Sequence, residues 1–327
     1  MNFLKPILYF VIIFLFLGCN DAVDSPYPSV SFQQIAVLPG TGRASAVAFA
    51  LNGKGYVTLG RDSNPADSLK DCWQYDPTAD SWTIVTAFPG RARVKAIAAV
   101  VNGKAYVGLG YKPHVSTYVN GNYKDVWMYD PTQNGWTRKA DFPSKATDAC
   151  VSFVRDNCIY VGSGFNDIGY TNEFWKYDTE KDTWTRLNNL PGDRAGATIC
   201  ADSAHIYYGT GYNEGNYNDW WEYFPATVSW KQRTSMPDNG RVNAVSLNIN
   251  HRFFVSSGRH WGGNLTGGHL ISDIVEYDAA RDVWYKRGNI PDGGRENAIS
   301  FVINGKGYIG QGENDTQIFN DFWSFVP

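Results

Sequence analysis

The sequence lacks a long apolar run, a cluster of basic residues and a regular set of cysteines. The longest unbroken apolar stretch runs from Ile7 to Leu17, which is too short for a helix that crosses a bilayer. Lys and Arg are scattered and the formal net charge is −3, so we expect no nucleic-acid partner. The five cysteines match no zinc-ligand spacing, and we expect no metal and no cofactor.

Aromatic residues and glycine are abundant instead. The chain of 327 residues contains 12 Trp, 20 Tyr and 18 Phe, together with 33 Gly. Aromatic side chains favour strands and glycine favours tight turns, so this composition predicts an all-β fold. A domain of this size needs no disulfide bonds to be stable. The sequence leaves disulfides open, but we favour free, buried thiols for Cys72, Cys150, Cys158 and Cys200.

The first nineteen residues resemble the export signal of a bacterial lipoprotein. One positive charge, Lys5, precedes the apolar stretch, and Cys19 ends it directly after a glycine. The match departs from the usual lipobox by having Phe16 where Leu is common. We expect residues 1–18 to be a signal peptide, Cys19 to carry a lipid, and residues 19–29 to form a flexible tether. The expected location is the outer membrane, at its periplasmic or its cell-surface face; a plain secretory signal is the alternative.

One pattern recurs along residues 30–327. A Tyr is followed seven residues later by a Trp, at Tyr75/Trp82, Tyr129/Trp136, Tyr177/Trp184, Tyr223/Trp230 and Tyr277/Trp284. Seven residues after each Trp stands a Pro, at Pro89, Pro143, Pro191, Pro237 and Pro291. An acid stands four residues before each Tyr, at Asp71, Asp125, Glu173, Asp219 and Asp273. This recurrence indicates a repeat architecture.

Each repeat opens with an apolar run and a tight turn. Asn-Gly pairs at 52/53, 102/103 and 304/305 separate two β-rich runs, which predicts a hairpin. A polar loop of variable length follows, then the strand with the acid and the Tyr, then the strand with the Trp. Four strands in a unit of 46 to 54 residues match the size of a propeller blade.

The units resemble kelch repeats, and the resemblance covers residues 30–327. The glycine pair that usually follows the second kelch strand is altered, since only its second member is kept. The retained glycines are Gly60, Gly110, Gly164, Gly211, Gly258 and Gly312. The resemblance implies an all-β, six-bladed kelch-type β-propeller. It also relates the chain to the galactose-oxidase-like superfamily and makes it similar in architecture to periplasmic sialic acid mutarotases.

The last unit ends after its third strand, near Trp323, and lacks a fourth. Phe32 stands seven residues before Pro39, which is the spacing of every Trp–Pro pair. We therefore expect the strand around residues 31–37 to complete the last blade. Five complete units and one shared unit give six blades, and joining the two ends of the chain removes an exposed sheet edge.

In kelch propellers the first strand of each blade lines the central channel, and the loops entering it share one face with the loops after the second strand. Five arginines open the first strand in an Arg-x-x-Ala pattern, at Arg43, Arg93, Arg194, Arg241 and Arg295, whereas we place Ala146 there in the third blade. Their guanidiniums could hold a carboxylate or phosphate of a ligand. They are also within reach of the repeated acid. Because a feature repeated in nearly every blade usually serves the repeat, we favour ion pairs.

Two further sets differ from blade to blade, as an asymmetric ligand requires. One set follows the retained glycine: Arg61, Tyr111, Phe165, Tyr212, Arg259 and Glu313. The other set stands two residues after the arginine position: Lys95, Asp148, Gly196, Asn243 and Asn297. Aromatic faces with Arg and Asn nearby suit sugars or peptides, and ordinary loop packing is the alternative. Trp261, in the long loop 259–272, joins these residues as a candidate for ligand binding.

The histidines and cysteines favour no metal enzyme. The longest loops contain His114 and Tyr118 in one case and His260 and His269 in the other, and the latter two lack a third ligand. His205 and His251 fall in hairpin turns on the opposite face. A copper site of the galactose-oxidase type needs two Tyr, two His and a Cys crosslinked to a Tyr. We expect Cys72 to be packed instead, and six blades depart from the seven of that family.

Two functions remain. A non-catalytic module would bind a glycan or a protein at the channel mouth. An enzyme of the sialic acid mutarotase type would use a Glu and an Arg near the mouth, for which Glu296, Glu313 and Arg295 are candidates. We favour binding by a monomer that contacts the membrane only through its lipid. Following the anomeric NMR signals of a freshly dissolved sugar would separate the two functions.

Overall fold

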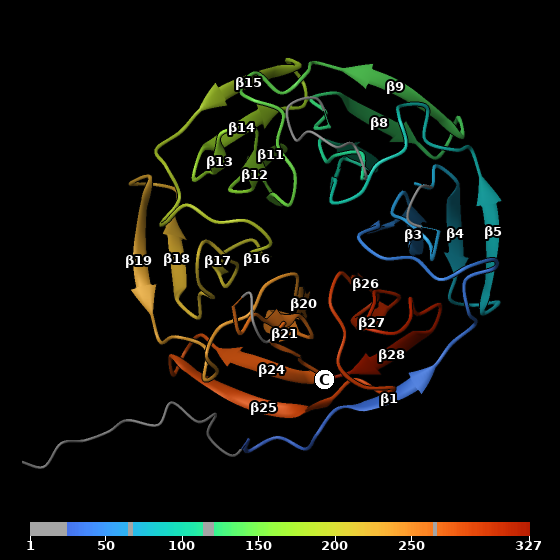
Figure 1. Cartoon of the computed structure of the whole chain (residues 1–327). Helices are drawn as coiled ribbons and strands as arrows, with labels where there is room; N and C mark the ends of the chain where they lie inside the picture. Colours follow the sequence, from blue (N-terminus) through green and yellow to red (C-terminus); the bar gives the residue numbers. More distant parts are fainter. Residues whose placement is uncertain (1–24, 65–67, 114–120, 264–266) are drawn as a thin grey trace, which may run out of the picture.

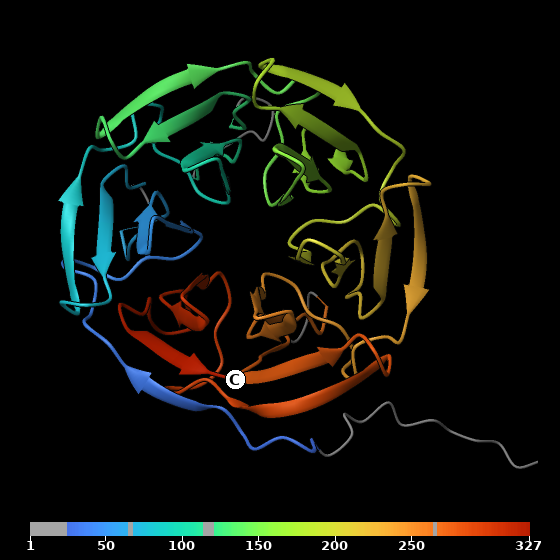
Figure 2. The same cartoon turned by 180° about the vertical axis from the view of Figure 1, so that it is seen from behind.

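Six four-stranded antiparallel sheets surround one axis in the computed structural model, which describes residues 25–64, 68–113, 121–263 and 267–327 (Figures 1 and 2). Each sheet is one blade, with its first strand nearest to the axis and its fourth strand at the rim. Within these described ranges there is no helix long and apolar enough to span a membrane. The all-β, six-bladed propeller predicted from the sequence is confirmed.

Blades 1 to 3 follow one another along the first part of the chain. Blade 1 consists of β2 (Val47–Leu51), β3 (Lys54–Thr58), β4 (Cys72–Asp76) and β5 (Ser81–Val85). Blade 2 consists of β6 (Ile97–Val101), β7 (Lys104–Gly108), β8 (Val126–Asp130) and β9 (Gly135–Lys139). Blade 3 consists of β10 (Val151–Arg155), β11 (Cys158–Gly162), β14 (Phe174–Asp178) and β15 (Thr183–Arg186), with an extra hairpin of β12 (Phe165–Asn166) and β13 (Gly169–Tyr170).

Blades 4 to 6 complete the ring. Blade 4 consists of β16 (Thr198–Ala201), β17 (Ile206–Gly209), β18 (Trp220–Phe224) and β19 (Ser229–Arg233). Blade 5 consists of β20 (Val245–Ile249), β21 (Arg252–Ser256), β24 (Asp273–Asp278) and β25 (Val283–Asn289), with an extra hairpin of β22 (Arg259–His260) and β23 (His269–Leu270). Blade 6 consists of β26 (Ile299–Ile303), β27 (Lys306–Gly310), β28 (Phe322–Val326) and β1 (Ser31–Gln34).

The start of the described chain closes the ring, as predicted. Strand β1 pairs antiparallel with β28, and Phe32 lies opposite Phe325 with ring centroids 5.1 Å apart. The segment before β1 reaches blade 5, where Arg287 donates to the carbonyl of Pro28 at 2.8 Å and Arg252 lies over the ring of Tyr27. Residues that we assigned to the tether thus contact blade 5. The predicted signal peptide and the predicted lipid site, Cys19, lie outside the described residues.

The spacing of the repeated Tyr and Trp has a structural reason. In four blades the Tyr hydroxyl donates to an Asp or Asn in the turn before the fourth strand: Tyr75–Asp80, Tyr129–Asn134, Tyr177–Asp182 and Tyr277–Asp282, over 2.5 to 2.9 Å. The Trp indole of the same blade donates to a backbone carbonyl just after the outer strand of the preceding blade, as Trp82 does to Ala36 at 2.8 Å. Blade 4 has Val228 at the turn position and lacks the Tyr bond in the region described. The pattern therefore joins neighbouring blades.

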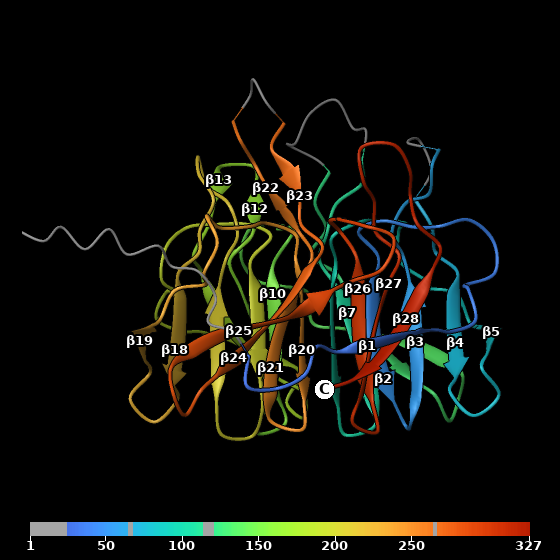
Figure 3. The ribbon, with the colours of Figure 1, turned by 90° about the horizontal axis from the view of Figure 1, so that it is seen from below.

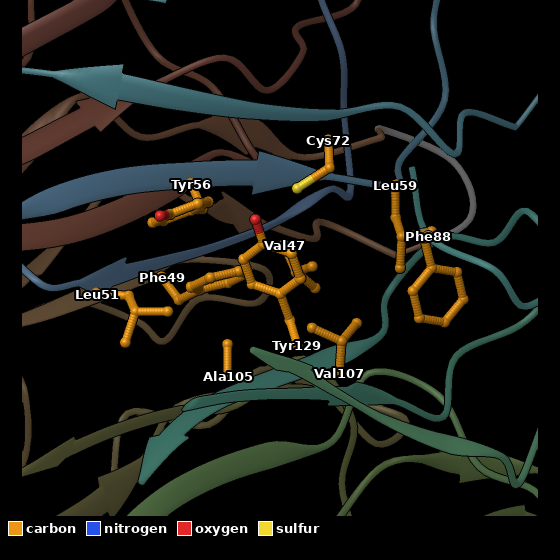
Figure 4. Close-up of a cluster of buried hydrophobic side chains, with 10 residues drawn as sticks. All are labelled: Val47, Phe49, Leu51, Tyr56, Leu59, Cys72, Phe88, Ala105, Val107 and Tyr129. Atoms are coloured by element: carbon orange, nitrogen blue, oxygen red, sulfur yellow. The ribbon is translucent and has the colours of Figure 1, made fainter. Parts of the chain in front are cut away.

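Apolar side chains fill each junction between blades. Figure 4 shows the junction of blades 1 and 2, where Phe49 of β2 and Cys72 of β4 pack with Val107 of β7 and Tyr129 of β8. Cys72 is fully buried, as predicted, and this burial raises the pKa of its thiol to about 12. A thiol held neutral in this way is a poor nucleophile and a poor metal ligand, so Cys72 serves packing.

Candidate functional site

The loops on one face of the ring meet at the channel mouth. In every blade one residue of the loop before the inner strand forms an isolated antiparallel bridge. Its partner is the residue directly after the retained glycine. The six pairs are Ala44–Arg61, Val94–Tyr111, Asp148–Phe165, Ala195–Tyr212, Val242–Arg259 and Glu296–Glu313. Figure 3 shows that the hairpins β12–β13 and β22–β23 stand on this same face. The backbone is therefore alike in all six blades at the mouth, whereas the side chains differ.

A closed belt of backbone hydrogen bonds runs around the mouth. The residue after each inner bridge position donates its N–H to its counterpart in the preceding blade, over 2.9 to 3.1 Å. The belt residues are Ser45, Lys95, Ala149, Gly196, Asn243 and Asn297. All six have a positive φ between 52° and 62°. Side-chain-bearing residues adopt this conformation only where the surroundings impose it, so the belt holds the mouth rigid.

The retained glycine is required by close backbone approach. At Gly110, φ is +84° and an added Cβ would lie 2.5 Å from the carbonyl oxygen of Val94. The N–H of Gly110 donates to Thr147 of the next blade at 3.1 Å, and the other five retained glycines make the equivalent bond. Any side chain here would push the two loops apart. This explains why the second glycine of the kelch pair is kept.

The belt corrects the alignment that we predicted for blade 3. We aligned Ala146 with the repeated arginines and Asp148 with Lys95. In the structure Ala149 is the belt residue and Asp148 is the bridge residue, so Thr147 stands where the other blades have Arg. The prediction is wrong by one residue because Ala146-x-x-Ala149 imitates the Arg-x-x-Ala pattern. Cys150, a small residue, takes the place of the alanine.

The five repeated arginines are buried in ion pairs, as we favoured. Each pairs with the repeated acid of its own blade: Arg43–Asp71, Arg93–Asp125, Arg194–Asp219, Arg241–Asp273 and Arg295–Asp321. The arginine residues are at most 2% exposed, and each also donates to the carbonyl before the retained glycine. Burial alone would raise the pKa of Asp71 and of Asp125, but the hydrogen bonds and charge of the paired arginine hold it below its ordinary value. These guanidiniums are therefore committed to the scaffold.

An open cavity of about 420 Å³ lies at the mouth, between blades 2 and 5. Five predicted residues line it: Tyr111, Phe165, Tyr212, Asn243 and Trp261. Lys95, Asp148 and Gly196 from the second variable set also line it, together with Tyr170, which the sequence analysis missed. We call this part of the mouth the aromatic side. The ring of Tyr170 packs edge-on against Phe165 at 5.0 Å and Tyr212 at 6.2 Å, which joins blades 3 and 4.

Trp261 is held at the rim of this cavity by a clamp. The side-chain amide of Asn216, in blade 4, donates to the Trp261 carbonyl at 2.8 Å and accepts from its N–H at 3.0 Å. The guanidinium of Arg259 lies 5.0 Å from the centre of its ring. Trp261 nevertheless stays 39% exposed. A large aromatic face is thus fixed in position and open to solvent beside the cavity.

Blades 5, 6 and 1 form a charged side of the mouth. Glu296 accepts from Arg259 Nε at 2.6 Å and from the Asn243 amide at 2.8 Å. Glu313 pairs with Arg61 and accepts from Asn297 at 2.9 Å. The predicted residues Arg61, Glu313 and Asn297 therefore bind one another, and Arg259 binds Glu296. None of the four lines the cavity on the aromatic side.

Asp148 is the acid of the aromatic side. It is 5% exposed and lines the cavity. Burial raises the pKa of Asp148 to about 6, although the charge of Lys95 and a hydrogen bond from Asn122 act against the rise. Glu296 holds the same bridge position in blade 6, and two blades separate it from blade 3 in either direction. Asp148 and Glu296 thus stand on opposite sides of the mouth.

Among the residues that the structure describes, the other histidines and the cysteines lie in loops, turns and strands away from any metal cluster. His260 and His269 pair across β22–β23 with rings 5.2 Å apart. In the described parts of the chain, no group of three His, Cys, Asp or Glu side chains is placed to hold a metal. His251 binds Asp202 on the opposite face, in a hairpin turn as predicted. The predicted loop residues His114 and Tyr118 lie outside the described residues, and the thiols of Cys72, Cys150, Cys158 and Cys200 are free.

Comparisons with known proteins agree with this fold. Residues 34–193 match the model of the KLHDC2/KLHL20/DRC7 Kelch-repeats domain. The N-acetylneuraminate epimerase of Yersinia enterocolitica (serotype O:8 / biotype 1B) is 37% identical over 79 residues, which are 21% of this chain and 20% of the epimerase. The solved structure of YjhT superposes with a TM-score of 0.75 and 20% identity, over 89% of this chain and 97% of that chain. The match spans only about a fifth of the epimerase, and the likeness to YjhT concerns the fold.

Proposed function

The chain is a six-bladed β-propeller built from kelch repeats, and on that premise we propose that it binds a sugar on the aromatic side of the channel mouth. The cavity there is concave and has the volume of a small-ligand site. Its lining combines the rings of Tyr111, Tyr212 and Trp261 with the polar groups of Lys95 and Asn243. Aromatic faces pack against the C–H faces of sugars, and a few polar groups hold the hydroxyls.

The single observation that supports this proposal is the position of Trp261. A tryptophan that is 39% exposed, yet clamped by Asn216 and stacked by Arg259, offers a preformed apolar face without an ordering cost. A protein partner, which the sequence also left open, would be served better by a flat or convex surface. We therefore favour a sugar over a protein as the ligand, bound by a monomer.

Saturation-transfer NMR with D-glucose, N-acetyl-D-glucosamine and N-acetylneuraminate tests this function. We expect at least one of these sugars to receive saturation from the protein. The double variant Tyr111→Ala/Tyr212→Ala should lose that signal while its melting temperature stays close to that of the wild type. Phe224→Ala, which removes an exposed ring at the end of β18 in blade 4, is the matched control and should bind normally. Equal binding by the wild type and the double variant would contradict the proposed site.

A second candidate function is the interconversion of sugar anomers. Two observations favour it: the local similarity to a protein named N-acetylneuraminate epimerase, and the presence of a titratable acid, Asp148, in the cavity. The candidates chosen from the sequence fit this reaction less well. Arg295 is fully buried against Asp321, and Glu296 and Glu313 are paired with Arg259 and Arg61.

We also propose that the chain is exported and held at the outer membrane by a lipid on Cys19. Supporting this is the apolar stretch Ile7–Leu17, which stops directly before a glycine and that cysteine. In a lipoprotein-processing bacterium, Cys19→Ser should move the protein from the membrane pellet to the soluble fraction. Cys158→Ser, at a free and half-buried thiol, should leave it in the pellet. A Cys19→Ser protein that resists a salt wash would exclude the lipid anchor.

A further inference from the structure

We propose that Asp148 is a catalytic residue of the mouth cavity, which exchanges a proton with the ring oxygen or the anomeric hydroxyl of a bound sugar. This inference rests on the proposed sugar-binding function and names the group that would turn binding into anomer interconversion. Asp148 belongs to the variable set that the sequence predicts to bind a ligand, and its true register aligns it with Glu296 of blade 6.

The backbone holds Asp148 firmly. Its N–H donates to the carbonyl of Phe165 at 3.0 Å, and its carbonyl accepts from the N–H of Phe165 at 2.9 Å. The next residue, Ala149, belongs to the belt. Asn122 braces the same loops by donating to the carbonyls of Ala146 and Phe165. So constrained a backbone fixes the point from which the Asp148 side chain projects, which contributes to the preorganisation that catalysis needs.

The surroundings of Asp148 favour proton exchange near neutral pH. The titratable or charged groups around it are Lys95 and Tyr111 from blade 2, Cys150 and Tyr170 from its own blade, and Tyr212 from blade 4. Lys95 provides the one positive charge in the described lining of the cavity. Burial dominates, and it raises the pKa of Asp148 to about 6. A carboxyl group with that pKa is present in both protonation states at physiological pH, as a general acid and base requires.

Glu296 shows that an acid at this bridge position does not by itself provide a carboxyl group for a ligand in the cavity. It occupies the same bridge position in blade 6, but its carboxylate is tied to Arg259 and Asn243. These contacts occupy both carboxylate oxygens of Glu296, so its side chain is engaged in the scaffold rather than turned to a ligand. The two acids at the mouth therefore have different roles, and the environment of each decides which role it takes.

The reaction needs no further reagent. In the forward direction the protonated carboxyl of Asp148 gives its proton to the ring oxygen, the bond from that oxygen to the anomeric carbon breaks, and the anomeric hydroxyl loses its proton to water. The products are an open-chain carbonyl and a new hydroxyl group. Rotation about the adjacent carbon–carbon bond and closure by the reverse steps give the other anomer, and Asp148 regains its proton. Atoms and electrons balance, and no oxidant or cofactor is consumed.

Exchange NMR on the intact protein tests the inference, with the sugar that gives the strongest saturation transfer as the probe. We expect the wild type to accelerate anomer exchange over buffer, and Asp148→Asn to lose about 100-fold of that acceleration while still binding the sugar. The wild-type rate should change around the pKa of Asp148, about 6, and the variant should lose this inflection. Asp148→Glu should keep an inflection, which covers the case in which Asp148→Asn does not fold. Asp141→Asn, at an exposed carboxylate paired with Arg138, should match the wild type.

The outcomes separate the two claims. A wild type that binds a sugar but does not accelerate exchange overturns the role of Asp148 and leaves the binding function in place. Full acceleration by Asp148→Asn overturns that role as well, as does a wild-type rate that is flat across the expected inflection. A wild type that binds none of the three sugars overturns the proposed function itself.

Discussion

Blades 3 and 6 place an acid at the same backbone position on opposite sides of the channel mouth, but the two acids have different neighbours. Glu296 in blade 6 faces Arg259 and Asn243, which satisfy both of its oxygens. Asp148 in blade 3 lines a cavity that also contains three tyrosines and the charge of Lys95. The repeat determines the backbone position of the acid. The variable residues of the neighbouring blade determine which groups its carboxylate contacts.

The comparison extends to the two halves of the mouth. On the charged side, ion pairs and amides bind one another and leave little that a ligand could use. On the aromatic side, rings from blades 2 to 5 surround a cavity. A symmetric scaffold thereby produces one asymmetric site, because each half is completed by different loop residues.

The largest effect should come from breaking the pair on the charged side. Arg259→Ala leaves Glu296, which is 7% exposed, without its cation. An unpaired buried carboxylate is costly, so we expect a loss of about 3 kcal/mol in the free energy of unfolding, measured by urea denaturation at pH 7. Arg281→Ala removes a solvent-exposed guanidinium paired with Asp278 and should cost much less stability. Similar losses in both variants would mean that Glu296 is solvated rather than buried.

On the aromatic side, replacing the acid should raise the free energy of unfolding, by less than Arg259→Ala lowers it. The pKa of Asp148 is about 6 in the folded state, above its ordinary value of 3.8, so the folded protein binds this proton more tightly than the unfolded chain. Ionisation of Asp148 therefore lowers the free energy of unfolding as the pH rises from about 4 to about 6. The free energy of unfolding of Asp148→Asn, relative to that of the wild type, should therefore rise by on the order of 2 kcal/mol from pH 4 to pH 8. The measurement is urea denaturation at both pH values, and a stability difference that does not change with pH would contradict the account.

Sugar binding should also distinguish the two sides of the mouth, with a smaller change in free energy. Trp261→Ala removes the exposed ring at the cavity and should weaken sugar binding about tenfold, in line with the loss of one aromatic contact. Arg61→Ala, on the charged side, should leave the dissociation constant unchanged. Titration calorimetry or NMR titration with the same sugar measures both. Loss of binding in Arg61→Ala with normal binding in Trp261→Ala would move the site to the charged side.

The smallest effect should come from the clamp. Asn216→Ala keeps every group of the cavity lining but releases the backbone of Trp261, so we expect binding to weaken by a few-fold. Because Asn216 acts through Trp261, the double variant Asn216→Ala/Trp261→Ala should bind no more weakly than Trp261→Ala alone. Additive losses would show that Asn216 contacts the ligand by itself.

The sequence predicted most of the fold because the blade is defined by local patterns. Asn-Gly pairs marked the first hairpins, and the spacing of Phe32 to Pro39 identified the strand that closes the ring. The arginine pairs were also predictable, since an acid recurs in step with each arginine. These features depend on residues a fixed distance apart in every repeat.

The site was less predictable because it depends on contacts between blades. Asp148 was among the predicted variable residues, but two alanines three residues apart imitated the repeat and put it one residue out of register with Glu296. Tyr170 and Asn216 lie in loops of irregular length, and no spacing in the sequence places either of them beside the cavity or beside Trp261. Only the closed ring shows which loops become neighbours and which charged residues neutralise one another.

The most direct measurement for the central claim is a crystal structure of the protein soaked with the sugar that binds best. The account predicts one sugar ring packed against Tyr111, Tyr212 or Trp261, with its ring oxygen or anomeric hydroxyl within hydrogen-bond distance of Asp148. A sugar held between Arg61, Glu313 and Arg259 instead, or one bound on the opposite face near His251, would contradict it.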